Sequence, residues 1–168
     1  GLKMFQPRAE ASLVMYKIND LIIYGSAGVC RVKDIKKSDL MGSGTKQLCY
    51  VLEPIYHDYV ISTPVENKKV FTRPILTKKE AEQLIESIPQ IDAEAYHNSV
   101  LRQLEAHYKT ILDTHDCTEI LKLIISLYSK KKESEEQNRK FGQIDERFLK
   151  QAEDLLFGEL SDSLDITR

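Results

Sequence analysis

The chain has 168 residues, of which 42% are hydrophobic and 30% are charged, and its formal net charge is −2. This length fits one ordinary domain or two small ones and excludes a large multidomain enzyme. The hydrophobic content is enough to form a core, which excludes wholesale disorder.

Charge is distributed unevenly along the chain. Residues 15–76 carry a net charge of +3, whereas residues 77–168 carry −6. Any contact with nucleic acid must therefore come from local basic clusters and not from the field of the whole chain.

The apolar runs are much shorter than the roughly 20 residues of a membrane-spanning helix, so no membrane span is predicted. The cysteines Cys30, Cys49 and Cys117 are widely spaced and form no CxxC pair, which argues against a disulfide framework and a cysteine zinc site. A cytoplasmic protein is the simplest expectation. Residues 1–14 fit poorly with the residues after them and are interpreted as a tag or an uncertain N-terminal extension.

Residues 15–76 are rich in Val, Ile, Tyr and Thr and are interrupted by glycine, a pattern typical of short strands and tight turns. Gly42 and Gly44 supply a hairpin turn, because glycine adopts positive φ without steric cost. The predicted strands are 18–24, 28–35, 47–53, 59–63 and a short one at 70–71. Five antiparallel strands in this length predict a small SH3-like or Tudor-like β-barrel.

Residues 77–168 change to helical patterns. Thr77 and Glu80 form a capping box for a first helix that ends at Pro89, and Asp92 is expected to open a second helix. Asp116 caps a third helix, and Gly142 separates it from a last helix that reaches residue 160. The chain is therefore predicted to be α+β in two domains, with a compact C-terminal all-α bundle after the barrel.

No arrangement of residues indicates catalysis or a bound cofactor. The glycine-bearing loop at 25–28 precedes a strand, so it lacks the helix N-terminus of a phosphate-binding loop. The spacing of His97, His107 and His115 does not bring them to one helix face, and no nucleophile–base motif is found. We predict no enzyme, no metal site and no cofactor.

The densest basic feature combines Lys130, Lys131 and Lys132 with Arg139 and Lys140. Three glutamates are interleaved with these cations: Glu133, Glu135 and Glu136. Two interpretations stay open, a solvated helix end whose cations lie near the negative end of the helix dipole, and a nonspecific contact with phosphate groups.

Four segments in order resemble the CarD family of bacterial transcription regulators, whose N-terminal domain is shared with the transcription-repair coupling factor. The segment from Tyr16 to Tyr24, followed by Gly28, is similar to the family's hydrophobic strand, turn and Val-Tyr-Pro sequence. Thr63 to Asn67 resembles its Val-Pro-x-(Asp/Glu)-Asn segment, and Arg73 to Ile75 resembles the Arg that closes the barrel. Residues 155–160, Leu-Leu-Phe-Gly-Glu-Leu, resemble its closing Ile-Leu-Val-Gly-Glu-Leu.

The resemblance implies that residues 15–76 bind the β subunit of RNA polymerase by pairing strand edge to strand edge. The implied contact residues are Lys36, Lys37, Ser38, Ile61 and Ser62. The family often has Arg at the positions of Ser38 and Ser62, so a charge contact here would shift to the two lysines. An open edge also allows a strand-swapped dimer as well as a monomer.

The resemblance further implies that residues 77–168 form a helical DNA-binding-like domain that contacts promoter DNA near the upstream edge of the melting bubble. Many members insert a Trp there, but this chain has no Trp, and the corresponding slot lies near Val100 or Leu101. The apolar stripe around Leu101 favours a core position for it instead. The implied DNA-binding residues are Leu101, Arg102, His107, Lys109, Arg147 and Lys150.

We therefore expect a regulator of transcription initiation that tethers to RNA polymerase and alters the stability of the open promoter complex. Because the helical half is acidic, DNA binding should be weak without polymerase. The alternative is a protein-interaction adaptor that binds polymerase through the barrel and makes no direct DNA contact.

Overall fold

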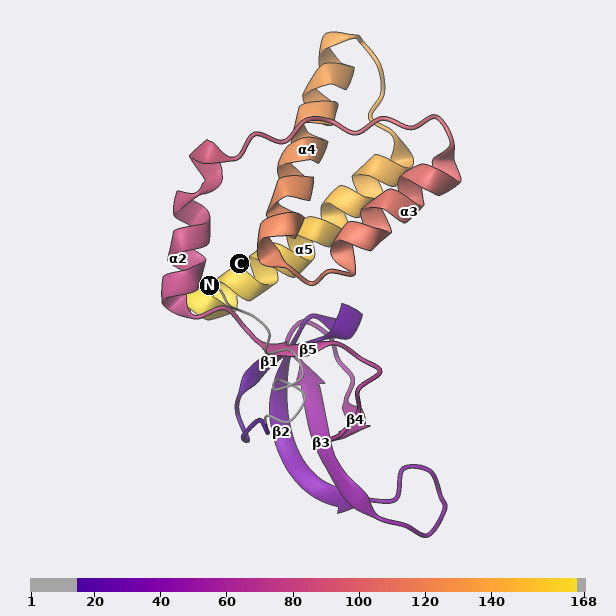
Figure 1. Cartoon of the computed structure of the whole chain (residues 1–168), viewed down its shortest axis with the longest axis vertical. Helices are drawn as coiled ribbons and strands as arrows, with labels where there is room; N and C mark the ends of the chain where they lie inside the picture. Colours follow the sequence, from indigo (N-terminus) through magenta and orange to yellow (C-terminus); the bar gives the residue numbers. More distant parts are fainter. Residues whose placement is uncertain (1–14, 166–168) are drawn as a thin grey trace. The chain divides into compact units, whose positions relative to one another are not determined.

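The computed structural model describes residues 15–165, so the extension interpreted at residues 1–14 lies outside the described residues. The chain divides into two compact units between Ile75 and Leu76 (Figure 1). The first is a five-stranded antiparallel sheet and the second consists of helices. The predicted α+β class is confirmed.

The sheet unit contains five antiparallel strands in the spatial order β4-β3-β2-β1-β5. Their bounds are β1 Leu21–Tyr24, β2 Val29–Ser38, β3 Gln47–Pro54, β4 Ile61–Pro64 and β5 Thr72–Pro74. The long hairpin of β2 and β3 turns at Gly42 and Gly44, whose φ angles of 67° and 85° require glycine, as the sequence predicts.

The sheet curls around a small core of its own. The buried members are Tyr16, Ile22, Cys30, Val32, Tyr50 and Leu52. The register of β2 against β3 shifts between Val32 and Asp34, and such a bulge increases the local bend of a strand. The hydroxyl of Tyr24 in β1 donates to Thr63 Oγ1 in β4 at 3.2 Å, although two strands separate β1 from β4. This contact closes the sheet into a barrel-like form.

Several strand boundaries differ from the sequence prediction. Strand β2 extends to Ser38 and not only to residue 35, and β4 is Ile61–Pro64 where the sequence predicts 59–63. The first strand begins at Leu21 and not at residue 18, because Asn19 has a φ of 78° within a turn held by the Asp20 N–H to Lys17 O bond. The last strand is Thr72–Pro74, whereas the sequence predicts a strand at 70–71. Phe71 precedes the strand, and its carbonyl accepts the N–H of Gly25.

The helical unit contains α2 Lys78–Glu86, α3 Leu101–Leu112, α4 Cys117–Glu136 and α5 Gln143–Leu164. The capping box of Thr77 and Glu80 is present, so this predicted helix start is confirmed. A short 3-10 turn at Ile88–Gln90 carries Pro89 after α2. The buried core of the unit is formed by Leu104, Tyr108, Leu112, Cys117, Ile120, Leu121, Leu123, Ile124, Leu127, Phe148, Leu149, Ala152 and Leu156.

The prediction of a helix opening at Asp92 is wrong. Residues 91–100 are not helical, and we call this segment the strap because it runs across α4 before α3 begins (Figure 1). Ser126 Oγ of α4 donates to Glu94 O at 2.7 Å, and Ser129 Oγ donates to Ala93 O at 3.5 Å. The serine hydroxyls donate to strap carbonyls that, in a helix, would accept N–H groups of the same segment. The apolar spacing of residues 91–100 is typical of a helix and does not reveal these tertiary bonds, so the sequence prediction failed here.

The cap of α4 provides a test of the helical unit. Asp116 accepts the N–H groups of Thr118 at 2.8 Å and Glu119 at 3.3 Å, so it satisfies two donors at the helix start. We expect Asp116→Ala to lower the free energy of unfolding by about 1 kcal/mol in urea titrations.

The matched control is Asp113→Ala, which removes an exposed carboxylate that pairs with Lys109 at the surface. This change should cost less than about 0.5 kcal/mol. Equal losses in the two variants would show that the Asp116 cap contributes nothing beyond ordinary surface charge.

Candidate functional site

The first candidate surface is the outer edge of β4. Among the described strands, β4 pairs only with β3. The Val65 N–H donates to Leu48 O, and the alternation of an antiparallel ladder then assigns the inward-directed backbone groups to Thr63 and Ile61. The N–H and C=O of Ser62 are therefore directed to the open side, where another strand can pair with them.

The five residues that the sequence assigned to polymerase binding do not lie on one face. In the register of the sheet, Lys36 aligns with Cys49 and Pro64, and Ser62 aligns with Val51 and then Asp34. These rows alternate with the row of Ile35, Tyr50 and Thr63, which contributes to the core. The positions on the outer face are Lys36, Ser38 and Ser62, and those on the inner face are Lys37 and Ile61.

Side chains of the motif residues hold β4 in place. Thr63 is 4% exposed, and its hydroxyl oxygen accepts the Tyr24 hydroxyl and, at 2.9 Å, the side-chain amide of Asn67. Asn67 also accepts the N–H of Lys69 at 2.9 Å, which orders the turn after the strand. The Tyr and Asn of the recognised segments therefore fix the position of the open edge.

Sequence reasoning missed two exposed apolar residues beside this edge. Tyr59 and Val60 immediately precede β4 and are 50% and 53% exposed. The sequence placed Tyr59 inside the strand, so both residues looked like ordinary strand positions. Only the observed start of β4 at Ile61 shows that they extend the open edge with apolar surface.

The second candidate surface is the start of α3. Leu101 is the first residue of α3 and is 62% exposed, and Val100 before it is 45% exposed. The expectation that Leu101 belongs to the core is wrong. It shares a stripe with Leu104 and Tyr108, both buried, but it lies one turn beyond the point where neighbouring helices cover that stripe.

Most of the predicted DNA-contacting cations form ion pairs. Lys109 Nζ lies 3.1 Å from Asp113, Lys150 Nζ lies 3.5 Å from Asp154, and Arg147 lies 3.0 Å from Glu105 of α3. The guanidinium of Arg147 also lies 5.0 Å from the centre of the Phe148 ring.

Two predicted residues of α3 differ from this group. Arg102 is exposed next to Leu101 and forms no ion pair with a described residue. The ring of His107 stacks on Tyr96 of the strap, with centroids 3.7 Å apart, and burial lowers the pKa of His107. His107 therefore packs against the strap as a neutral ring and lies on a different side of α3 from Arg102.

Lys130 differs from both interpretations of the basic run. Its side chain is 12% exposed and its Nζ lies 3.0 Å from Asp145 of α5, whose side chain is 7% exposed. Asp145 also accepts the hydroxyl of Tyr108 at 2.6 Å. Burial, followed by the bond to Asp145, raises the pKa of Tyr108, so the hydroxyl stays protonated. We call Lys130, Asp145 and Tyr108 the polar clamp, because it joins α4, α5 and α3.

Metal-binding and membrane-spanning features are both absent from the described part of the chain. Within residues 15–165, no three His, Cys, Asp or Glu side chains come together as a metal site. No helix in this range is long and apolar enough to cross a membrane.

Comparison with known proteins identifies the first unit. Residues 16–76 match the family model described as the CarD-like/TRCF RID domain. The matched range covers all five strands, and it ends where the helical unit begins. The chain thus carries a CarD-like RNA polymerase-interacting domain, as the sequence resemblance indicated. A search of curated proteins found no match.

Removal of one partner of the polar clamp should strongly destabilise the helical unit. Asp145→Ala leaves the Lys130 ammonium buried without its carboxylate, so we expect the free energy of unfolding to fall by about 3–5 kcal/mol in urea titrations. Tyr108→Phe, which removes only the hydroxyl, should cost about 1 kcal/mol.

A double variant separates the ion pair from general packing. Lys130→Met combined with Asp145→Leu should recover much of the stability lost in Asp145→Ala, because no charge is then left unpaired. The pair is not coupled if the loss of unfolding free energy in the double variant equals the sum of the losses in Lys130→Met and Asp145→Leu measured singly.

Proposed function

Because residues 16–76 form a CarD-like RNA polymerase-interacting domain, we propose that the protein is a cytoplasmic bacterial regulator of transcription initiation. In this proposal residues 15–76 bind the polymerase β subunit, and residues 77–168 contact promoter DNA at the upstream edge of the bubble. The observation that carries the proposal is the family match of a sheet whose β4 edge is open.

The polymerase contact is β-augmentation, in which a strand of the partner pairs with β4. The backbone groups of Ser62 supply hydrogen bonds, and Tyr59 and Val60 supply apolar contact beside them. An edge of four residues is small, so we expect a Kd of about micromolar size for this contact alone.

Charge on the outer face gives this contact specificity. Lys36 is exposed on the same face as Ser62 and forms no ion pair with a described residue. A partner surface with carboxylates beside its edge strand complements it and speeds association. Lys37 has the same charge but lies on the opposite face, which makes it a matched control.

We expect Lys36→Glu to weaken binding of the full chain to a fragment of the polymerase β lobe about tenfold, because attraction becomes repulsion. Lys37→Glu should change the Kd less than about threefold. Isothermal titration calorimetry at low salt measures both values.

Equal effects of the two substitutions would show that the outer face does not face the partner. No binding by the unchanged protein would remove the β subunit from the proposal. A well-folded fragment that binds neither variant nor wild type would then favour a different polymerase subunit.

The DNA contact uses the start of α3. Leu101 projects from the first turn, where unsatisfied backbone N–H groups and the positive end of the helix dipole face the solvent. An apolar side chain in this position can enter a base step at the edge of melted DNA, and the adjacent Arg102 can contact phosphate. The side chain of Leu101 replaces the family's Trp as a smaller wedge.

The effect on transcription is thermodynamic. A protein that binds polymerase and the melted promoter better than the closed one shifts the equilibrium toward melting by the difference in binding free energy. Whether transcription rises or falls then depends on which step limits each promoter.

We expect Leu101→Ala to weaken the protein's binding to a polymerase–promoter complex about 5- to 30-fold, because about 1–2 kcal/mol of apolar contact with the DNA is lost. Leu101→Trp should strengthen it. Because Leu101 is 62% exposed, the unfolding free energy of Leu101→Ala should change by less than about 0.5 kcal/mol.

The ion pairs of the helical unit favour a second candidate. Lys109, Lys150 and Arg147 are already bound to carboxylates, which reduces the positive charge offered to DNA. An adaptor that binds polymerase and recruits a protein through the helices is consistent with this. Unchanged affinity in Leu101→Ala and Leu101→Trp would select the adaptor.

A further inference from the structure

We propose that Asn98 of the strap is a positioning residue for the DNA contact, because its side chain holds the first turn of α3, from which Leu101 projects. The inference rests on the proposed DNA contact at Leu101. It adds the interaction that keeps this contact rigid before DNA is bound.

The start of α3 lacks the kind of cap that α2 and α4 have. Thr77 caps α2 and Asp116 caps α4, each through a side-chain oxygen that accepts backbone N–H groups. The N-cap of α3 is Val100, whose apolar side chain cannot accept a hydrogen bond. The ends of helices fray most easily, and fraying here would displace Leu101, the first residue of the helix.

Asn98 constrains this turn from two residues before the N-cap. Its Oδ1 accepts the N–H of Val100 at 2.9 Å, which fixes the backbone where the helix begins. Its Nδ2 donates to Gln103 Oε1 at 3.1 Å and to the hydroxyl oxygen of Tyr96 at 3.2 Å. One side chain therefore joins the strap, the N-cap and the first turn of α3.

The aromatic partner of Asn98 is packed against the core of the helical unit. The Tyr96 ring stacks on His107 of α3 with centroids 3.7 Å apart and an interplanar angle of 12°. It also meets Tyr108 of the polar clamp edge to face, with centroids 6.5 Å apart. Asn98 thus connects an exposed helix end to rings that the buried clamp holds in place.

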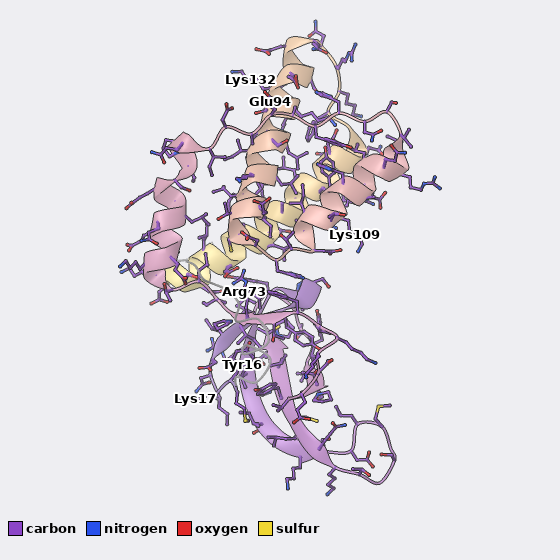
Figure 2. The ribbon with its side chains drawn as sticks, in the orientation of Figure 1. Tyr16, Lys17, Arg73, Glu94, Lys109 and Lys132 are labelled. Carbon is purple, nitrogen blue, oxygen red and sulfur yellow. The ribbon has the colours of Figure 1, made fainter. Side chains whose placement is uncertain are left out.

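The part of the strap before Asn98 is fixed to α4. The Ser126 hydroxyl donates to Glu94 O at 2.7 Å, and His97 Nε2 lies 3.1 Å from Glu133 Oε2. Figure 2 shows Glu94 where the strap crosses α4. Because α3 and α4 both hold the segment that carries Asn98, this side chain can resist displacement of the first turn.

The displaced cap leaves the start of α3 apolar. Val100 and Leu101 are 45% and 62% exposed. A Ser, Asp or Asn at position 100 would cap the helix directly, but it would place a polar side chain beside Leu101. With Asn98 in this role, the helix start is held and the side chains that enter a base step remain apolar.

Rigidity has a large effect on this contact because leucine offers less apolar surface than tryptophan. Binding by a flexible turn must offset the loss of backbone and side-chain entropy when the turn becomes ordered. A turn that is already ordered in the free protein avoids this cost. Asn98 therefore preserves the modest contact energy of Leu101 for the DNA.

The first measurement is ¹⁵N NMR relaxation of the full chain without polymerase. In Asn98→Ala, we expect the backbone order parameters of residues 100–103 to fall from about 0.85 to about 0.6, from rigid to flexible backbone. The matched control is Thr114→Ala. Thr114 Oγ1 accepts the Asp116 N–H at 3.2 Å across the same two-residue spacing, but after the end of α3. Unchanged order parameters in Asn98→Ala would overturn the inference.

The second measurement is the affinity of the full chain for polymerase holoenzyme on a promoter fragment with a pre-melted bubble. Asn98→Ala should weaken binding about three- to tenfold. Tyr96→Phe keeps the stacked ring and removes one partner of Asn98, so binding should weaken less than about threefold. Thr114→Ala should bind within about twofold of the wild type.

A double-mutant cycle separates positioning from a general structural role. If Asn98 acts through Leu101, then Asn98→Ala should weaken binding less than about twofold when Leu101→Ala is already present. Additive losses in the double variant would overturn the inference, because Asn98 would then contribute to binding independently of Leu101.

A parallel titration with holoenzyme alone identifies the source of any change. Weaker binding of Asn98→Ala to holoenzyme without DNA would overturn the inference in favour of a protein contact. If Leu101→Ala binds the promoter complex as tightly as the wild type, the proposed DNA contact fails and the inference fails with it. Order parameters that still fall in Asn98→Ala would then place the failure in the DNA contact and not in the Asn98 bonds.

Discussion

The helical unit depends on the buried pair of Lys130 and Asp145, because this pair joins α4 to α5 and, through the Tyr108 hydroxyl, both to α3. Removing a lysine and an aspartate from water costs several kcal/mol each, so the pair contributes less net stability than its short contact indicates. Its larger effect is on specificity of packing. An apolar core alone permits helices to slide by small amounts, whereas a carboxylate that must meet both an ammonium and a hydroxyl permits one arrangement.

In the sheet unit, one edge of β4 is open and the strand is held in place by side-chain hydrogen bonds on its inner side. Thr63 faces inward from β4 and accepts hydrogen bonds from Tyr24 and Asn67, while the adjacent Ser62 directs its backbone outward. A short strand held by β3 alone would fray at its ends. The two partly buried hydrogen bonds to Thr63 hold the strand from its inner side, so its outer side can remain available for a partner strand.

The sequence was sufficient for features that depend on neighbouring residues. The Thr77 capping box, the Asp116 cap and the glycine turn were all predicted, because each depends on local hydrogen bonds or on a backbone angle. The predictions that failed concern features that depend on tertiary contacts. Residues 91–100 have helical spacing but bond to serines of α4, and Leu101 continues an apolar stripe that its neighbours no longer cover. Lys130 resembles its neighbours Lys131 and Lys132 in sequence, yet only Lys130 meets a buried carboxylate, which lies 15 residues further on.

In the proposed function, the acidic helical unit contacts DNA weakly through the start of α3, and the polymerase tether brings this contact within reach of the DNA. Net charge acts at long range and is screened over about 8–10 Å at physiological salt, so the exposed Arg102 affects a nearby phosphate more than distant carboxylates do. A tether through β4 converts DNA binding into an intramolecular step whose effective concentration depends on the polymerase complex. Neither a strong wedge nor a basic domain is then required. The net charge of −6 over residues 77–168 also disfavours binding of this unit to free DNA, which is consistent with a proposed DNA contact that depends on the polymerase tether.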